Sequence, residues 1–371
     1  MKKHSQLKIS LIAVGVGFLF AFLIVILAGR NPLNLLAAII KSVSGFNILR
    51  PNEPVTLVNT LNWLKYAVPI TLTGLSVGFA YRTGLFNIGG EGQILAGGTA
   101  AAAVALMVDL PPIIHPIVCL MAGALAGALW GFVPGILKAV RGINEVVICI
   151  MMNYVGLYAT SWFTRAFLPI DPATNARTID FPDSAVLGKV FEGIPSLFNW
   201  GFLVAIVGII AFWFIMEKTT FGYSLRATGF NKEGARFAGM KVERNIALSM
   251  MISGAFCGLA GAVLILGEFG YGRIQTSFDN FGFDGISVAL VGGSNAIGIM
   301  LSGLLFGLLK SASSNLQMMN IPKEVSELAQ AVIIYLIAIQ YAVILVLDKF
   351  NAKKKKKNQQ IEETVKGGDQ V

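Results

Sequence analysis

The chain has 371 residues, of which 55% are hydrophobic and only 13% charged, and its formal net charge is +9. Soluble domains carry about 25% charged residues. With so little polar surface the chain could not stay in water as a compact particle, whereas a bilayer accepts apolar side chains on the outside of a protein. The composition excludes an ordinary soluble enzyme. Nucleic-acid binding is also not expected, because the basic residues lie between apolar runs and not on one folded face.

Metal binding, nucleophilic catalysis and ATP binding lack the residues they need. Cys119, Cys149 and Cys257 lie in apolar stretches, as packed hydrophobic side chains do. His4 and His115 are far apart, with no cysteine or carboxylate cluster at metal-ligand spacing. The sequence contains no G-x-x-x-x-G-K-[ST] phosphate loop. We therefore expect no catalytic residues, no metal site and no cofactor bound by this chain.

A transmembrane helix needs about 20 mostly apolar residues. The first apolar run follows a basic start, as in a signal peptide, but it is too long and no cleavage site follows it, so we predict an uncleaved helix. With it, ten spans are predicted, at 9–28, 64–81, 92–108, 114–134, 145–163, 199–216, 246–266, 283–299, 300–316 and 330–347.

The distribution of Lys and Arg orients these spans, because cytoplasmic loops are enriched in both residues. It predicts cytoplasmic termini, an outer loop at 164–198 and an inner loop at 217–245. Residues 33–62 lie outside in this topology and include a possible interfacial helix. We assign 1–348 to one membrane domain and 349–371 to a basic, then polar, cytoplasmic tail that is disordered. Its lysine run is interpreted as an anchor near anionic lipid rather than a recognition site.

Glycines at every fourth position predict close helix packing. Gly123, Gly127, Gly131 and Gly135 share one helix face, where a neighbouring backbone can approach. The pairs 254/258 and 303/307 repeat the spacing on other spans. Tight packing is the preferred interpretation over a ligand-binding role, and it favours a compact bundle.

The segment RTGLFNIGGEGQILAGG at 82–98 places Asn87, Glu91 and Gln93 between two apolar spans. Its glycines interrupt any continuous helix. A carboxylate at the bilayer centre costs about 3 kcal/mol on insertion scales, so Glu91 must face a partner or water unless it lies among the headgroups. A broken helix lining a transport pathway and a short solvated cytoplasmic turn are both compatible with this composition.

A second glycine-broken segment, NFGFDGISVALVGGSNAIG at 280–298, includes Asn295. Corresponding interruptions in two halves suggest an inverted repeat. Further polar residues, Glu145 and Asn153, lie in RGINEVVICIMMNYVG. An amide in mid-span needs a hydrogen-bond partner, and Asn153 could serve either helix packing or solute contact. The candidate pathway or gate residues are Asn87, Glu91, Gln93, Glu145, Asn153 and Asn295.

The inner loop contains SLRATGFNKEGARFAGMKVERN. We predict a short helix that begins near Asn231, a favoured N-cap residue, with Glu233 in its first turn. Gly234 stands where a complete capping box would have Glu or Gln. A slim helix with one aromatic side chain, Phe237, could enter a groove of another protein, although an ordinary basic loop would have the same composition.

Taken together, GLFNIGGEGQILAGG, the inner-loop segment continued through NIALSMMISGAFCGLAGA, and FGFDGISVALVGG resemble the signatures of bacterial ABC-importer permeases of the ribose, branched-chain amino acid and nucleoside group. The resemblance extends over about residues 60–345. The extended outer loop with ARTIDFPDSAVL, the preceding NEVVICIMMNYV and the chain length are most similar to nucleoside-type permeases.

The resemblance implies an all-α polytopic membrane protein of type II-like permease fold, with about ten transmembrane helices, in the bacterial plasma membrane. It implies three partners: a cytoplasmic ATPase that binds ATP and Mg²⁺, a second permease half that is a related or identical chain, and an extracellular solute-binding lipoprotein. Gly234 departs from the family pattern, which usually has Ala, and should loosen that turn. The residues implied to couple to the ATPase are Arg226, Asn231, Glu233, Ala235, Arg236, Phe237 and Gly239, with Ala238 on the same signature.

The function expected from the sequence is ATP-driven import of nucleosides. Ribose or another simple sugar is the alternative substrate within the same class. An ion-coupled secondary transporter is the alternative from a different class, and few acidic residues deep in the spans speak against it. A membrane-embedded enzyme fails because no catalytic cluster is present.

Overall fold

The computed structural model describes residues 3–335, apart from residues 28, 50, 53, 192–197, 319–320, 323, 326, 329–330 and 333–334, and for 3–13 it describes the backbone only. The last predicted span, 330–347, lies almost wholly outside the described residues. The tail at 349–371 and the domain boundary at 348 lie outside them as well, so both stay predictions.

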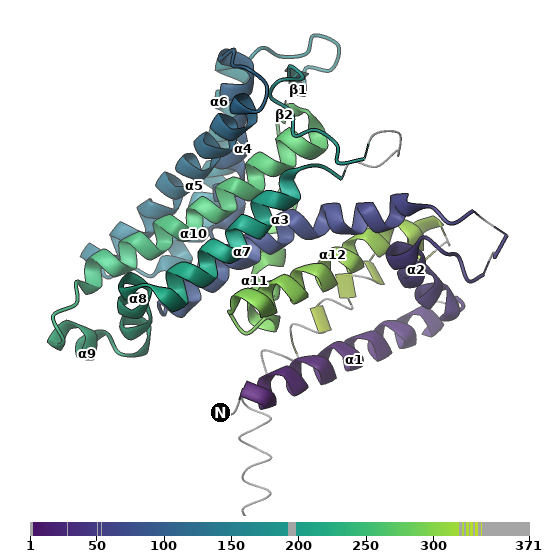
Figure 1. The fold of residues 1–371 in the computed structure, drawn as a ribbon, viewed down its shortest axis with the longest axis horizontal. Helices are drawn as coiled ribbons and strands as arrows, with labels where there is room; N and C mark the ends of the chain where they lie inside the picture. Colours follow the sequence, from purple (N-terminus) through teal and green to yellow (C-terminus); the bar gives the residue numbers. More distant parts are fainter. Residues whose placement is uncertain are drawn as a thin grey trace, which may run out of the picture.

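The described chain folds into a bundle of helices with one small two-stranded sheet (Figure 1). The first helices are α1 (Lys3–Leu27), α2 (Leu33–Ser44), α3 (Leu57–Arg82), α4 (Gly90–Met107), α5 (Ile114–Arg141) and α6 (Glu145–Phe167). They are followed by α7 (Gly201–Lys218), α8 (Thr220–Phe230), α9 (Lys232–Phe237), α10 (Val242–Leu264), the π-helix η1 (Ile265–Phe269), α11 (Phe281–Val291) and α12 (Ala296–Met318). The strands β1 (Arg177–Asp180) and β2 (Tyr271–Arg273) pair antiparallel.

The helical bundle agrees with the predicted fold class, but the count of ten spans is not confirmed. Within the described residues, five helices are long and apolar enough to cross a membrane: α5, α6, α7, α10 with η1, and α12. Helices α1, α3 and α4 coincide with three further predicted spans, and α2 coincides with the predicted interfacial helix.

The predicted span at 283–299 is divided by a turn into parts of two helices. The chain turns between α11 and α12, where Gly293 and Ser294 adopt positive φ angles of 60° and 51°. Asn295 then begins α12, because its side-chain oxygen accepts a hydrogen bond from the Gly298 amide at 2.9 Å. With 11 residues, α11 is about 16 Å long, roughly half of a bilayer core.

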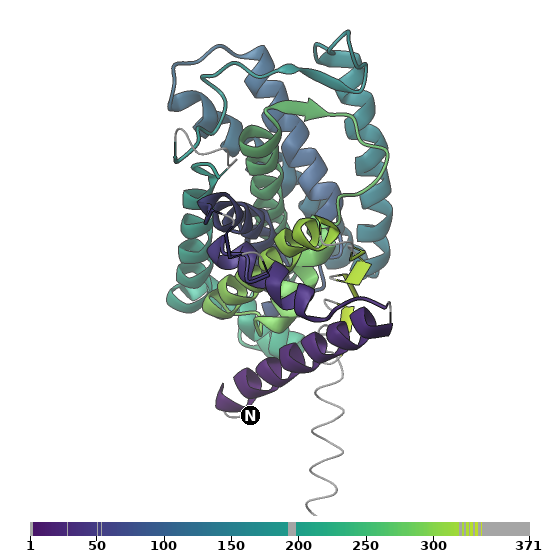
Figure 2. The same ribbon diagram turned by 90° about the vertical axis from the view of Figure 1, so that its right-hand side faces the viewer.

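Helix α10 is central and packs against α5, α4 and α3. The predicted glycine contacts are confirmed at the α5–α10 interface. A Cβ atom on Gly127 would lie 2.4 Å from the Gly254 carbonyl oxygen, and one on Gly258 would lie 2.2 Å from that of Gly123. In the other part of the bundle, α12 packs against α3, α2 and α11. Helix α1 runs along the edge of the bundle in both views (Figure 2).

The two polar loops lie at opposite ends of α10 (Figure 1). Helices α8 and α9 occupy the end where α10 begins, and β1 and β2 occupy the other end. At the second end, Arg177 of β1 connects residues of the outer loop by ion pairs with Asp171 at 3.0 Å and Asp180 at 3.1 Å. This arrangement agrees with the prediction that 164–198 and 217–245 lie on opposite sides.

Candidate functional site

Asn87 lies in the break between α3 and α4 and is fully buried. Its amide nitrogen donates to the Ser253 hydroxyl at 2.7 Å and to the Gln93 side-chain oxygen at 2.8 Å. In return, Gln93 donates to the Asn87 side-chain oxygen at 3.1 Å. Ser253 also hydrogen-bonds Ser76 of α3, with the two hydroxyl oxygens 2.9 Å apart. We call these four residues the amide network, and it joins α3, α4 and α10.

Asn153 connects α6 to the same break. Its side-chain oxygen accepts from the Gly92 amide at 2.8 Å, and its nitrogen donates to the Ile88 carbonyl at 2.9 Å. Only 2% of Asn153 is exposed. The amide therefore satisfies two backbone groups that the broken helix leaves unpaired, which favours the packing interpretation of this residue in the described conformation.

Replacing Asn153 by leucine is expected to destabilise the protein, because each unpaired buried group costs about 1–3 kcal/mol. The thermal midpoint of the detergent-solubilised chain should fall clearly. The neighbouring variant Tyr154→Phe is the control, since Tyr154 is 53% exposed and loses only its hydroxyl. An unchanged midpoint for Asn153→Leu would contradict the packing role.

Glu91 links the two glycine-broken segments. Its carboxylate accepts from the backbone amides of Gly282 at 2.6 Å and Phe283 at 3.3 Å, and it is 2% exposed. These amides belong to the first turn of α11, where the helix dipole favours a negative charge. A Cβ on Gly282 would lie 2.5 Å from the Glu91 amide nitrogen. The two predicted interruptions are thus in contact, while the inverted repeat stays a prediction.

The remaining two predicted pathway residues lie away from the amide network. Glu145 begins α6 and pairs with Lys138 of α5 at 2.8 Å. Asn295 caps α12 and is exposed. Its neighbour Ser294 accepts from Arg82 at 3.4 Å, at the end of the bundle where α8 lies. The structure therefore groups four of the six residues and places Glu145 and Asn295 separately.

Helix α9 begins where the sequence predicts. The Asn231 side chain accepts from the Gly234 amide at 3.0 Å, and Gly239 follows the helix with a φ of 78°. Arg236 forms ion pairs with Glu233 and Glu243. Phe237 is 96% exposed, and among the described residues Phe230 of α8 is exposed to a similar degree, 93%.

One residue of α9 faces inward. Ala235 is 4% exposed and packs in a buried cluster with Leu85, Cys149 and residues of α10. Leu85 precedes Asn87 by two positions, so one buried cluster includes residues of α9 and of the helix break.

Arg226 of α8 reaches the end of α7, where it and Arg82 both pair with Glu217. This cluster joins α3, α7 and α8 at one end of the bundle.

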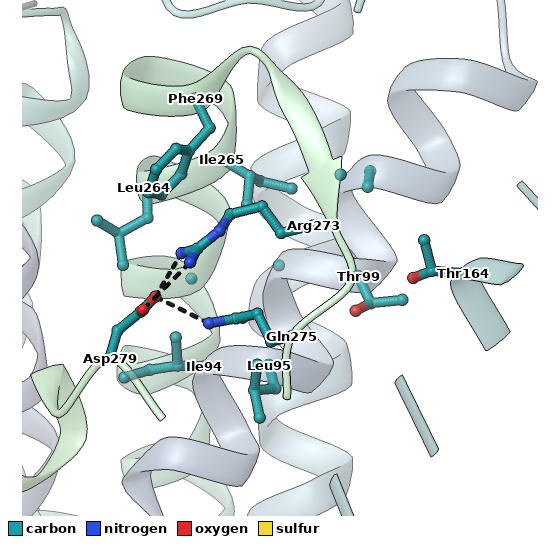
Figure 3. A pocket seen from close by; sticks show the side chains of 14 residues that line it. Ile94, Leu95, Thr99, Thr164, Leu264, Ile265, Phe269, Arg273, Gln275 and Asp279 are labelled. Carbon is teal, nitrogen blue, oxygen red and sulfur yellow. Dashed lines mark hydrogen bonds and ion pairs between the residues drawn. The ribbon is translucent and has the colours of Figure 1, made fainter. Parts of the chain in front are cut away.

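A cavity with an empty volume of about 430 Å³, counting its open mouth, is lined from Ile94 onward, directly after Gln93 of the amide network. Its walls come from α4, α6, α10, η1 and the loop from β2 to α11 (Figure 3). The polar lining residues are Thr99, Thr164, Arg273, Gln275 and Asp279.

None of the six predicted pathway residues lines this cavity. The sequence reasoning missed its polar residues because single threonines inside apolar helices carry no local signal. The π-helix η1, which forms part of the cavity wall, also has no recognisable sequence pattern. Such helices are rare and often lie at functional sites.

Lys65 and Lys310 each pair with a carboxylate of a neighbouring element of the bundle. Lys65 of α3 binds Glu268 of η1 at 2.9 Å, with exposed fractions of 9% and 16%. Lys310 of α12 binds Asp284 of α11, also at 2.9 Å. Ionisable residues at membrane depth are costly unless they are paired. Both lysines have a carboxylate partner here.

Comparison with known proteins agrees with the resemblance of the sequence signatures. The family model described as branched-chain amino acid transport system / permease component matches residues 59–338. The guanosine ABC transporter permease protein NupP of Bacillus subtilis is 40% identical over 95% of this chain and 99% of its own length. The nucleoside ABC transporter permease protein NupB of Lactococcus lactis subsp. cremoris is 30% identical over 95% and 96%.

The glucose ABC transporter permease protein TsgB13 of Haloferax volcanii is 31% identical over 75% of this chain and 76% of its own length. No solved structure matches the chain. The family match covers most of the chain and includes the amide network, α9 and the cavity. The chain therefore belongs to the family of branched-chain amino acid transport system permease components, which are membrane transport subunits.

Proposed function

We propose that this chain is the permease subunit of an ATP-driven ABC importer and that it translocates nucleosides across a bacterial plasma membrane. The observation that carries the proposal is the 40% identity to a guanosine permease over nearly the full length of both chains. A partner ATPase binds ATP and Mg²⁺, and an extracellular lipoprotein delivers the solute. A second permease half, related or identical, completes the membrane pathway.

The coupling mechanism follows from the position of α9. The ATPase receives Phe237 in a groove, because the side chain is almost fully exposed and has an apolar ring to bury. Movement of α9 passes through buried Ala235 to Leu85 and from there to Asn87. Arg226, Asn231, Glu233, Arg236 and Gly239 shape this contact.

In the same proposal the amide network is the gate. Gln93 of the network immediately precedes Ile94, which lines the cavity, and Asn87 follows two positions after Leu85, which shares a buried cluster with Ala235 of α9. Opening requires Asn87 and Gln93 to exchange partners. Glu91 and Asn153 hold the broken helices beside the gate, and Glu145 and Asn295 lie toward the α9 end of the pathway.

The topology of the proposal places α9 and both termini in the cytoplasm. It rests on the excess of Lys and Arg in the predicted inner segments. Six of these residues lie in the loop that contains α8 and α9: Lys218, Arg226, Lys232, Arg236, Lys241 and Arg244.

Of the two alternatives to ATP-driven nucleoside import, one is supported by a specific observation and the other is opposed by one. Sugar import is favoured by the similarity to a glucose permease. Ion-coupled transport is disfavoured by the state of the acidic residues at membrane depth. Glu268 and Asp284 pair with lysines, and Glu91 accepts from two backbone amides, so each of the three carboxylates has a partner in the described structure.

The test is uptake by the complete transporter in proteoliposomes, with the ATPase, the second permease half and the solute-binding protein present. Guanosine should accumulate only with ATP, and an ATPase variant that cannot hydrolyse ATP should abolish uptake. Uptake by this chain alone in a proton or sodium gradient would support the ion-coupled alternative. ATP-dependent uptake of ribose or glucose without guanosine would support the sugar alternative.

A further inference from the structure

The cavity described above contains a buried hydroxyl group without a partner. Thr164 of α6 is 2% exposed and lines the cavity, and its hydroxyl makes no hydrogen bond with any described residue. By contrast, Thr160, one turn earlier on the same helix, donates to the Gly156 carbonyl at 2.7 Å. Buried polar groups are normally satisfied, so the Thr164 hydroxyl lacks a partner that a ligand or water would supply.

A second hydroxyl faces the same space. Thr99 of α4 lines the cavity, and its side chain likewise makes no hydrogen bond within the described chain. Figure 3 shows the hydroxyl oxygens of Thr99 and Thr164 on one side of the cavity, turned toward the side where Asp279 lies. Two helices thus present hydroxyl groups to one volume.

The opposite wall is polar but has no net charge. Asp279 accepts from both terminal nitrogens of Arg273, and from the Gln275 amide at 2.9 Å. The Arg273 guanidinium also lies over the Phe269 ring, 4.3 Å from its centroid. A compensated pair does not select an ionic ligand, whereas a fixed carboxylate remains a good acceptor for hydroxyl groups.

The rest of the wall is apolar, with Ile94, Leu95, Leu264 and Ile265 contributing. A neutral ligand with hydroxyl groups on one part and a flat apolar surface on another matches this distribution. An anion, a cation or a purely apolar solute does not.

We propose that this cavity is a solute site that binds the sugar hydroxyls of a ribonucleoside or a free sugar, with Thr99 and Thr164 on one side and Asp279 on the other. The inference rests on the proposed transport function for its choice of solutes. It assigns recognition within the membrane subunit to residues that are not part of the amide network.

Binding to the purified permease tests the site without requiring transport. The measurement is protection against thermal unfolding in detergent by guanosine, by 2′,3′-dideoxyguanosine and by ribose, each titrated separately. The wild-type chain should be protected by guanosine at concentrations at least tenfold below those needed for the dideoxy compound, because that compound lacks both vicinal hydroxyls. Protection by ribose but not guanosine would identify a free sugar as the source of the hydroxyls.

The variants Thr164→Val and Thr99→Val remove a hydroxyl at nearly constant volume and break no hydrogen bond of the described chain. Loss of one neutral hydrogen bond weakens binding by about 3–10-fold. Each variant should therefore raise the concentration of guanosine needed for protection by that factor. The difference between guanosine and the dideoxy compound should become smaller. Thr160→Val is the matched control and should change the protecting concentration less than about twofold, because its hydroxyl lies outside the cavity lining.

The possible results separate this inference from the proposed function. Protection of the wild type by none of the three compounds overturns the inference, as does equal protection of the wild type and both cavity variants. Protection that depends on Thr164 and Thr99, combined with no ATP-driven uptake by the complete transporter, supports the site and contradicts the transport proposal.

Discussion

Substitution of Gly127 by valine is expected to prevent stable assembly of the bundle. The first added carbon would lie 2.4 Å from the Gly254 carbonyl oxygen and 2.6 Å from the Gly258 Cα atom. Both neighbours are backbone atoms, which cannot rotate away as a side chain can. Relief therefore requires α5 and α10 to separate along several turns. Overpacking costs about 1–3 kcal/mol even where side chains can adjust, and total stabilities are only about 5–15 kcal/mol.

The thermal midpoint of the detergent-solubilised protein and its elution as a monodisperse species measure this effect. Gly127→Ala should lower the midpoint, and Gly127→Val should leave little monodisperse protein. Leu125→Val is a matched control on the same helix, because Leu125 is 62% exposed and points away from α10. A valine variant as stable as the wild type would contradict the backbone contact.

Substitution of Phe237 by alanine is expected to reduce ATP-driven uptake by at least tenfold without reducing the stability of the chain. The ring is 96% exposed, so its removal creates no hole in this protein. Burial of one Phe side chain in a partner contributes about 1.5–3 kcal/mol, and each 1.4 kcal/mol corresponds to a tenfold change in affinity. Association with the ATPase should weaken accordingly.

The double variant Phe237→Ala/Arg236→Ala should uncouple the transporter further. Arg236 holds Glu233 and Glu243 together, so its loss also loosens the end of α9. Solute-stimulated ATP hydrolysis and uptake are measured in proteoliposomes, with membrane insertion checked separately. Leu129→Ala, which truncates an exposed apolar side chain on α5, should behave as wild type. Retained uptake by an inserted double variant would rule out α9 as the coupling element.

Features set by neighbouring residues could be predicted from the sequence. Asn231 caps α9 because an Asn before a helix accepts from the third amide of the first turn. The spacing of Gly123 and Gly127 put both on one face regardless of the partner helix. Glycine clusters likewise marked the break before α4.

Features set by distant residues could not be predicted. Glu91 and Gly282 are 191 positions apart, and nothing local to either indicates the other. Nothing in the sequence around Lys65 indicates its pairing with Glu268, and nothing around the two threonines indicates that both line the cavity. The glycines of 280–298 indicated an interrupted segment, but they did not indicate that Gly293 and Ser294 adopt positive φ angles and divide the predicted span at 283–299 between two helices.

The glycine contacts between α5 and α10 also constrain how the protein can move. Carbonyl oxygens and Cα atoms meet at Gly123, Gly127 and Gly131 on successive turns, so sliding one helix past the other would drive backbone into backbone. We therefore expect the pair to move as one rigid body. In the proposed transport cycle, the helices that can move are therefore α3, α11 and α12. Single side-chain bonds, such as Ser76 to Ser253 and Lys65 to Glu268, join them to that body, and these bonds can break one at a time.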